Sequence, residues 1–360
     1  MTAAPPNSLS DGPLSETVEY SVSANLLNRL HSLNISIAFT SYQSGLLYFI
    51  GRNGQGGINV HQVAIPKPMG LFRDHAGGLT MAAGFQIIRF ENVLQAGQKI
   101  NHLFDACFVP RLVHVTGQLD AHDVGVDECG RPVFVNTRFN CLATVCHRHS
   151  FEPLWRPPFV SALVDEDRCH LNGLAMANGQ PRYVTAVSRS DTIDGWRDRR
   201  ANGGVVMDVV SNQIVCEGLS MPHSPRLHNG KLWLLNSGAG ELGFVDVSAG
   251  DGHYQPVAFC PGFVRGLAFC GDYALVGLSR PRYQRFSGLD LDARLEQADS
   301  DPWCGIQIID LNTGACVDWF RIDGAVGELY DVEIIPDISA PMAVAPGSNE
   351  VANLITFAEP

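Results

Sequence analysis

Three histidines stand just before three similar phrases of this sequence. His122 precedes "DVGVDECGRPVFVNT", His170 precedes "LNGLAMANGQPRYVTAV" and His223 precedes "SPRLHNGKLWLLNS". Histidine is the side chain that most readily moves a proton near neutral pH, and it is also a common metal ligand. If the fold gathers the three imidazoles, they suit a divalent metal ion with an open position for substrate or water. One hypothesis is therefore a metal site held by these three residues.

A structural interpretation of the same histidines stands beside the metal hypothesis. His170 lies two residues before Asn172, the first aligned residue of its phrase, whereas the other two histidines lie one residue before theirs. Polar side chains near a wet channel also hydrogen-bond the backbone of neighbouring loops. Under this interpretation the histidines hold the loops together and bind no metal.

Other residues near these phrases could hold an anion or move a proton. Arg265 could bind a carboxylate or phosphate and stabilise developing negative charge. Asp331 or Glu333 could act as a general base or as a further ligand. The remaining candidates for ligand binding are Asp123, Asn172, Ser224, Arg226, Trp196, Arg282 and Tyr283.

Two insertions are longer than a turn between strands requires. Ser188 to Gly204 carries Trp196 among arginines, and Ser279 to Gly305 carries Arg282 and Tyr283. Both follow strand-like runs, "VTAV" and "LVGL". If these loops overhang one site, they give it a basic and aromatic rim that suits an anionic or peptide-like ligand. The alternative is two solvated loops that balance local acidic charge.

The elements that must position these residues are strands. From Ile35 onward, short runs rich in Val, Ile, Leu, Phe and Tyr alternate with Gly, Asn, Asp and Pro turns. The repeated phrase recurs at spacings of about 40 to 65 residues, with roughly four strands per repeat. This pattern predicts an all-β fold, a β-propeller. The copies begin near Gly70, Asp123, Asn172, Ser224, Arg265 and Asp331.

The count of phrases predicts six blades, with seven as the alternative. The copy at Asp331 has only its first strand, while residues 36–65 supply three strands that lack a first one. Pairing the N- and C-terminal strands closes the ring and satisfies edges that would otherwise be exposed. A two-sheet sandwich is the structural rival, but it does not explain the repetition. In a propeller the starts of the inner strands converge on one mouth of the channel, where we expect the candidate residues.

The chain divides into a leader, one domain and a tail. We expect a flexible leader at 1–21, a single propeller domain at 22–340 and a C-terminal tail at 341–360. Leucines at helical spacing predict one amphipathic helix over 22–34.

Composition describes a soluble globular protein. Of 360 residues, 45% are hydrophobic and 17% are charged, and the formal net charge of −12 argues against nucleic acid or anionic lipid as partners. The ten cysteines form no C-x-x-C pair, which favours buried thiols in a reducing compartment. No apolar run reaches a membrane span, and no secretory signal opens the chain. We expect a cytoplasmic protein whose partner is a small molecule or peptide.

Several motifs resemble a bacterial protein family that carries an uncharacterised label and is sometimes fused to tetratricopeptide or sulfotransferase regions. The motifs are "FTSYQSGLLYFIG", "GGLTMAAGFQIIRFENV", "HDVGVD", "VFVNTRFNCLATV", "HLNGLAM" and "HSPRLHNGKLWLLNSGAGELGFVD". The resemblance covers nearly the whole chain beyond the leader and implies no particular reaction. In fold alone the chain is similar to the six-bladed gluconolactonase and regucalcin group, whose channel holds a divalent metal through carboxylate and amide side chains. The positions that match in type are Asp123, Asn172 and Asp331, and the histidines depart from that pattern.

Two functional hypotheses follow. The first is an enzyme that acts at the channel mouth on a small molecule or modified peptide, with help from one divalent metal ion; hydrolase, lyase and oxidoreductase chemistry all stay open. The second is a non-catalytic module that holds a ligand or protein at the same mouth.

Overall fold

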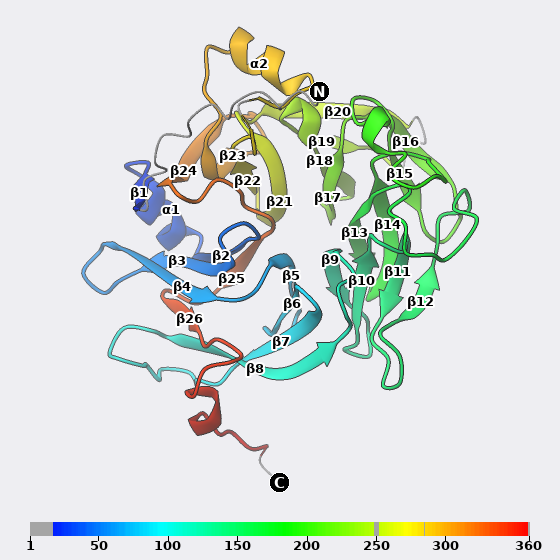
Figure 1. Ribbon diagram of the computed structural model, residues 1–360. Coiled ribbons are helices and arrows are strands. Elements are labelled where there is room, and N and C mark those ends of the chain that lie inside the picture. The colour runs from blue at the N-terminus through cyan, green and yellow to red at the C-terminus, as the bar shows by residue number, and fades with distance from the viewer. Residues whose placement is uncertain (1–16, 248–251, 284, 359–360) are drawn as a thin grey trace, which may run out of the picture.

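Six sheets surround a central axis in this computed structural model, which describes residues 17–247, 252–283 and 285–358 (Figure 1). The predicted six-bladed β-propeller is confirmed. Residues 1–16 of the expected leader lie outside the described residues. No helix of the described residues is long and apolar enough to cross a membrane.

Each blade is an antiparallel sheet whose first strand faces the channel, and the strands follow the chain from the channel outward. The blade that opens the continuous series contains β5 (Pro68–Arg73), β6 (Leu79–Ala83), β7 (Gln86–Asn92) and β8 (Ala106–Val115). The next two contain β9 (Ala121–Val126), β10 (Pro132–Asn136), β11 (Cys141–Thr144) and β12 (Glu152–Trp155), then β13 (Leu171–Ala177), β14 (Gln180–Ala186), β15 (Gly204–Asp208) and β16 (Ile214–Leu219). The last two contain β17 (Pro222–His228), β18 (Lys231–Asn236), β19 (Glu241–Val245) and β20 (Tyr254–Phe259), then β21 (Phe263–Cys270), β22 (Tyr273–Ser279), β23 (Cys304–Asp310) and β24 (Cys316–Gly324).

The sixth blade combines the two ends of the domain, as the truncated last repeat predicts. Its inner strand is β25 (Val332–Pro336), and it continues outward through β2 (Ile35–Ser41), β3 (Leu46–Arg52) and β4 (Ile58–Ala64). Phe39 of β2 lies opposite Val332 of β25 in an antiparallel register. Hydrogen bonds between strands some 290 residues apart in the sequence therefore close the ring.

Apolar packing seals the same closure. Phe39 and Tyr48 stack with ring centroids 4.7 Å apart, and Phe320 of β24 lies 6.1 Å from Phe39. All three side chains are buried, and so are Leu26 and Leu30 of the N-terminal helix. The helix thus covers the seam between the composite blade and the last continuous blade.

Turn chemistry explains the sharp hairpins between inner and second strands. Asn178-Gly179 connects β13 to β14, and Asn229-Gly230 connects β17 to β18. All four residues have positive φ, between 48° and 75°. Two-residue hairpins of this type need φ > 0 at both positions, which Asn and Gly adopt at least cost. The turns fix the register that aims each inner strand at the channel.

Hydroxyl side chains link neighbouring blades near the ends of second strands. The Oγ1 of Thr40 donates to the carbonyl of Met69 at 2.6 Å, and the Oγ1 of Thr137 donates to the carbonyl of Leu171 at 2.7 Å. Two serines make the same kind of bond to the following blade. Ser237 donates to Val264 in the inner strand β21 at 2.6 Å, and Ser279 donates to Leu329, just before the inner strand β25, at 3.2 Å. The Thr or Ser that ends the repeated phrase is therefore a connection between blades.

The segments at the two ends differ from the expected boundaries. Residues 18–21 of the expected leader and Val22, expected to begin the helix, form β1 (Val18–Val22), a fifth strand that pairs with the outer edge of β24. The predicted helix is shorter than 22–34: α1 spans Leu26–Ser32. Part of the expected tail is strand β26 (Pro341–Ala343), which pairs parallel with β8. The 3-10 turn η3 (Val351–Asn353) follows.

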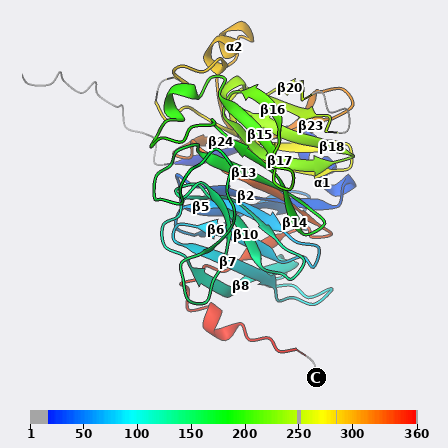
Figure 2. The same cartoon turned by 90° about the vertical axis from the view of Figure 1, so that its right-hand side faces the viewer.

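A second helix, which the sequence analysis missed, lies in the insertion after β22. This helix, α2 (Leu291–Gln297), buries Leu291 and Leu295, four residues apart. Figures 1 and 2 show α2 and the C-terminal segment at opposite edges of the ring. Two further 3-10 turns, η1 (Arg197–Arg199) and η2 (Ser237–Ala239), lie in loops that follow second strands.

Candidate functional site

A cavity of about 650 Å³ lies at the channel mouth where the inner strands begin. All six blades contribute to its wall through inner-strand starts or through the loops after second strands. Two predicted histidines and four other predicted residues line it, whereas the remaining predicted residues are not part of its lining. The predicted residues in the lining are His122, His170, Trp196, Arg265, Arg282 and Tyr283.

His122 is buried and held in one tautomer. Its Nδ1 lies 2.8 Å from the backbone carbonyl of Asp120 and 2.9 Å from the hydroxyl of Thr137. A carbonyl only accepts hydrogen bonds, so Nδ1 must carry the proton and Nε2 keeps a lone pair. Burial lowers the pKa of His122 to about 4, and the neighbouring His170 and Arg265 oppose a positive charge on it further. At neutral pH this imidazole is therefore an uncharged hydrogen-bond acceptor in the cavity wall.

His170 forms a dyad with a carboxylate. Its Nδ1 lies 2.6 Å from Oδ2 of Asp167, and Oδ1 of Asp167 accepts the backbone N–H of His170 at 3.0 Å. A carboxylate on Nδ1 fixes the ring orientation and leaves Nε2 to exchange protons. The ring stacks on Trp196 at 4.1 Å and meets His122 edge-on at 4.8 Å. His170 thus has the surroundings of a general base.

The offset of His170 has a structural reason. Inner strands begin after a residue in the left-handed region in four blades: Lys67, Asp120, His170 and Met221 have φ between 47° and 53°. His170 therefore occupies the position of Asp120, not that of His122. Its side chain leaves the backbone at the turn and reaches the cavity from a different direction. Left-handed residues other than Gly cost energy and gather at functional sites.

His223 repeats the surroundings of His122 but lies outside the cavity lining. Its Nδ1 lies 2.8 Å from the carbonyl of Met221 and 2.9 Å from the hydroxyl of Ser237. Burial lowers the pKa of His223 well below its usual range. Its Nε2 is buried without a hydrogen-bond partner among the described residues, and its ring meets Phe263 edge-on at 5.6 Å. His223 is a neutral imidazole in the channel wall.

No three His, Cys, Asp or Glu side chains gather as metal ligands within the ranges that the structure describes. The divalent metal assigned to His122, His170 and His223 stays a prediction. The set of Asp123, Asn172 and Asp331 does not fit a metal, because an arginine lies between its two carboxylates.

That arginine is Arg226, in the middle of the channel. Its guanidinium lies 2.9 Å from Oδ2 of Asp123 and 3.4 Å from Asp331. Each carboxylate also accepts a backbone N–H of the next blade: Asp123 from Leu174 at 2.9 Å and Asp331 from Leu71 at 2.8 Å. Buried charges persist only when paired and hydrogen-bonded in this way. The network joins the inner strands, which favours a structural role for residues predicted to bind ligand or act in catalysis.

The other deep residues also make local contacts. Oδ1 of Asn172 accepts from the hydroxyl of Thr185 at 2.8 Å, and the hydroxyl of Ser224 accepts the N–H of Gly266, in the next blade, at 3.0 Å. Burial raises the pKa of Glu333 to about 8. None of these residues belongs to the described cavity lining. Their assignment as ligand-binding or catalytic residues stays a prediction on which the proposed function does not rest.

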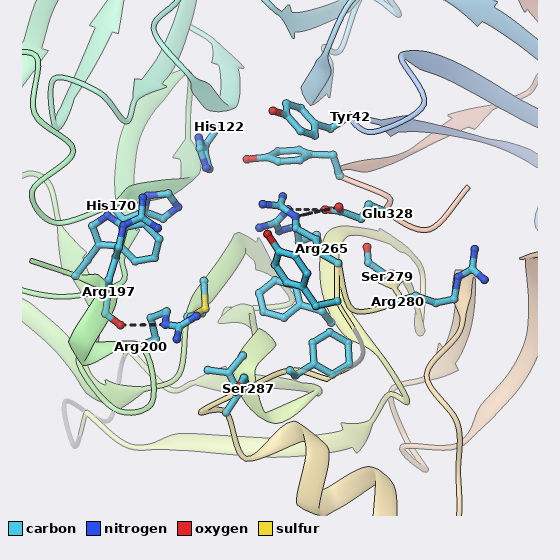
Figure 3. Close-up of a pocket in the computed structure, with 18 of the residues that line it drawn as sticks. Tyr42, His122, His170, Arg197, Arg200, Arg265, Ser279, Arg280, Ser287 and Glu328 are labelled. Carbon is cyan, nitrogen blue, oxygen red and sulfur yellow. Dashed lines mark hydrogen bonds and ion pairs between the residues drawn. The ribbon is translucent and has the colours of Figure 1, made fainter. Parts of the chain in front are cut away.

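Arg265 faces the two cavity histidines (Figure 3). Its guanidinium lies beside the rings of Phe263 and Tyr330, 5.0 and 5.2 Å from their centroids. The carboxylate of Glu328 lies 4.0 Å away and bonds instead to Arg282 at 2.9 Å. Burial lowers the pKa of Arg265, which means that its cation is poorly compensated.

Both predicted loops overhang the mouth. Trp196 and Phe286, one from each insertion, belong to a small apolar cluster with Leu291 and Leu295 of α2. Arg197 and other loop arginines line the cavity, and Arg197 lies over the ring of Trp196 at 4.5 Å. The predicted basic and aromatic rim is therefore present at this mouth.

Sequence reasoning missed the acidic residues of the site. Asp120 and Asp167 precede His122 and His170 by two and three residues, and these short spacings were the signal that could have identified them. Glu328 left no comparable signal, since its partners Arg265 and Arg282 come from a distant part of the sequence.

Comparison with known proteins places the chain in a family. The model of a domain of unknown function, DUF4915, matches residues 24–344. The chain belongs to the DUF4915 family. This confirms the resemblance to an uncharacterised family, and no curated protein matches the sequence.

Solved structures resemble the DUF4915 protein in fold alone. A chain of the nidogen/laminin complex is 10% identical, with a TM-score of 0.52, over 84% of this chain and 99% of that one. A streptogramin B lyase is 11% identical, with a TM-score of 0.39, over 80% and 76% of the two chains. An inactive virginiamycin B lyase from Staphylococcus aureus with quinupristin is 11% identical, with a TM-score of 0.39, over 84% and 99%.

Proposed function

We propose that the mouth cavity is an active site in which His170 acts as a general base on a small molecule or modified peptide. The observation that carries the proposal is the 2.6 Å contact between Nδ1 of His170 and Asp167, in a cavity that also presents Arg265. A cavity of about 650 Å³ is large enough for a ligand of drug size. The reaction type that fits this arrangement is proton abstraction.

Each residue has a distinct role in this step. Nε2 of His170 takes a proton from the substrate, Asp167 stabilises the imidazolium, and the proton later returns to the product. Arg265 stabilises the negative charge that the abstraction leaves on the substrate. The lone pair on Nε2 of His122 accepts a hydrogen bond that orients the substrate. The step balances without an oxidant or a further reactant.

A cytoplasmic location belongs to the same proposal. No disulfide joins the ten cysteines, which all lie among the described residues, and burial raises the thiol pKa of seven of them: Cys107, Cys141, Cys169, Cys260, Cys270, Cys304 and Cys316. Reducing compartments keep thiols from forming disulfides.

Hydrogen exchange tests the proposed chemistry directly. The protein is incubated in heavy water with a panel of small carboxylates and short peptides, and deuterium incorporation at carbon is followed by mass spectrometry. We expect exchange into at least one compound and a loss of about 100-fold or more in His170→Gln. The matched control is His149→Gln, an exposed histidine that does not line the cavity, which should retain full activity.

The alternative function is a non-catalytic binding module, which the rim favours because Tyr283 is 86% exposed beside the loop arginines. A ligand that binds equally well to the wild type and to His170→Gln, with no deuterium incorporation in any compound, would select the binding module.

A further inference from the structure

The cavity contains a cation with too little hydrogen bonding. No hydrogen bond of the Arg265 side chain is found among the described residues, and its Nε is buried without a partner. The carboxylate of Glu328 lies at 4.0 Å, the outer limit of an ion pair, and Asp120 acts on Arg265 as a further negative charge without an ion pair to it among the described residues. A buried charge without hydrogen-bond partners costs free energy unless another group pairs with it. An anion from outside the chain would pair with Arg265 in this way.

A second polar group beside Arg265 lacks a partner. The hydroxyl of Tyr330 is buried without a hydrogen bond among the described residues, although Tyr330 lines the cavity and its ring lies against Arg265. Burial keeps the pKa of this phenol well above its usual range, so the hydroxyl is protonated and can donate. Arg265 and Tyr330 together offer donors to one acceptor group.

Glu328 is the internal counter-charge of this site. Both of its oxygens accept from Nε of Arg282, at 2.9 and 3.0 Å. Its distance to Arg265 is longer, 4.0 Å (Figure 3). Arg282 belongs to the loop after β22 and its side chain is 57% exposed. Glu328 thus neutralises Arg282 first, which leaves Arg265 open to a competing anion.

The charge around the cavity agrees with an anionic ligand. Six arginines and three carboxylates line it, in a chain whose formal net charge is −12. A local basic cavity in an acidic protein attracts anions to that point. The arginines are Arg197, Arg200, Arg265, Arg280, Arg282 and Arg285.

We propose that the substrate carries an oxyanion group, a carboxylate or a phosphate, which binds Arg265 and the hydroxyl of Tyr330 in place of a full contact with Glu328. This inference rests on the proposed function, since it names the substrate class for the same cavity. Guanidinium binds both oxyanions through paired N–H donors. The bound group places the adjoining atoms between Arg265 and the two cavity histidines, where His170 removes the proton.

Calorimetric titration with malonate and with inorganic phosphate tests the inference without requiring turnover. Chloride at matched ionic strength is the control for unspecific charge effects. We expect saturable binding of one of the two probes at millimolar concentration or below. Whichever probe binds more tightly identifies the oxyanion as carboxylate or phosphate.

Variants locate the binding. Arg265→Met should weaken the affinity by about tenfold or more, and Arg265→Lys should lose less because it keeps the charge but not the paired donors. Glu328→Gln should tighten binding about threefold because the competing carboxylate is gone. The control Arg321→Gln, on the outer strand β24, should bind as the wild type does.

Folding of Arg265→Met is checked by its melting temperature without ligand. Since the arginine is a poorly compensated buried charge, its replacement by an apolar side chain should leave the melting temperature unchanged or raise it. Binding that survives in a folded Arg265→Met, or the absence of binding beyond the chloride control in the wild type, overturns the inference. His170→Gln should keep its anion affinity, so Arg265-dependent binding without any hydrogen exchange contradicts the proposed function alone.

Discussion

At the scale of single residues, the site combines two imidazoles with different hydrogen-bond partners. His122 is held neutral by burial and by its fixed Nδ1 proton, whereas Nδ1 of His170 lies 2.6 Å from the carboxylate of Asp167. Different partners on two titratable groups allow one to act as a hydrogen-bond acceptor and the other as a base. Arg265 supplies the positive charge opposite both.

Removing the charge of Asp167 should abolish most of the activity. In Asp167→Asn the amide no longer stabilises an imidazolium and no longer fixes the tautomer, so we expect the hydrogen-exchange rate to fall about 100-fold or more. Asp165→Asn, two residues away and paired with Arg138 at the surface, is the control and should show no loss. Equal rates in the two variants would remove Asp167 from the mechanism.

The buried neutral His122 should make stability depend on pH. Its pKa is about 4 in the folded state against 6.5 as the ordinary value, so above pH 6.5 both states are neutral and its contribution is fully present. Below that, the unfolded chain takes up a proton that the folded chain cannot, and stability is lost as the pH falls toward 4. The loss amounts to roughly 3 kcal/mol.

Urea titrations of the wild type and His122→Gln at pH 7 and pH 4.5 measure this contribution. For each protein the free energy of unfolding at pH 4.5 is subtracted from that at pH 7, and the two results are compared. The variant should lose less stability between the two pH values than the wild type does. His149→Gln should behave as the wild type, and a His122→Gln variant with an unchanged pH dependence contradicts the expected neutral state.

At the scale of elements, the blades are joined by hydroxyls as well as by apolar contacts. Thr137 follows β10, donates to the carbonyl of Leu171 at the start of β13, and lies 2.9 Å from Nδ1 of His122. One side chain therefore connects two blades and orients a cavity histidine. The basic and aromatic rim lies on loops that follow second strands. The hydroxyls that join the blades lie at the ends of the same strands, so the contacts between blades and the geometry of the site depend on neighbouring residues.

Thr137→Val should cost stability and activity together. The change keeps the shape but leaves a buried carbonyl without its donor, which costs about 1 to 3 kcal/mol. Urea unfolding measures this loss, and hydrogen exchange should also fall because His122 loses a partner. Ser32→Ala, an exposed hydroxyl bonded within α1, should change neither quantity.

At the scale of the whole molecule, the ring is closed by strands from the two ends of the domain. β25 pairs with β2, and Phe39 of β2 packs against Phe320 of β24 across the seam. In a closed ring each inner strand packs between two neighbours, and the starts of these strands form the cavity wall. The cavity therefore depends on the closure, although Phe39 and Phe320 do not line it.

Phe39→Ala should weaken the closure strongly. Truncation of a fully buried phenylalanine costs roughly 3 to 5 kcal/mol, and we expect one cooperative unfolding transition at lower urea. Phe85→Ala, at a 45% exposed position, should cost less than about 0.5 kcal/mol. An early separate transition of the composite blade alone would show that the ring does not unfold as a unit.

The sequence by itself determined the six blades, the composite closure and the mouth at which His122, His170 and Arg265 meet, because repetition of one phrase repeats one local structure. It also located the two overhanging loops. It did not determine the helix α2 within the second loop. This helix depends on tertiary contacts, because Leu291 and Leu295 pack in one apolar cluster with Trp196 of the other loop.

Only the tertiary structure decided how the residues at the inner-strand starts are used. Asp123 and Asp331 bond to Arg226 in the channel, His223 lies outside the cavity, and His170 enters the site from a left-handed turn. The physical reason is that hydrogen bonds and charge pairs join different blades. Residues in one repeat bind partners one or more repeats away, and a sequence shows the spacing within a repeat but not the pairing between repeats.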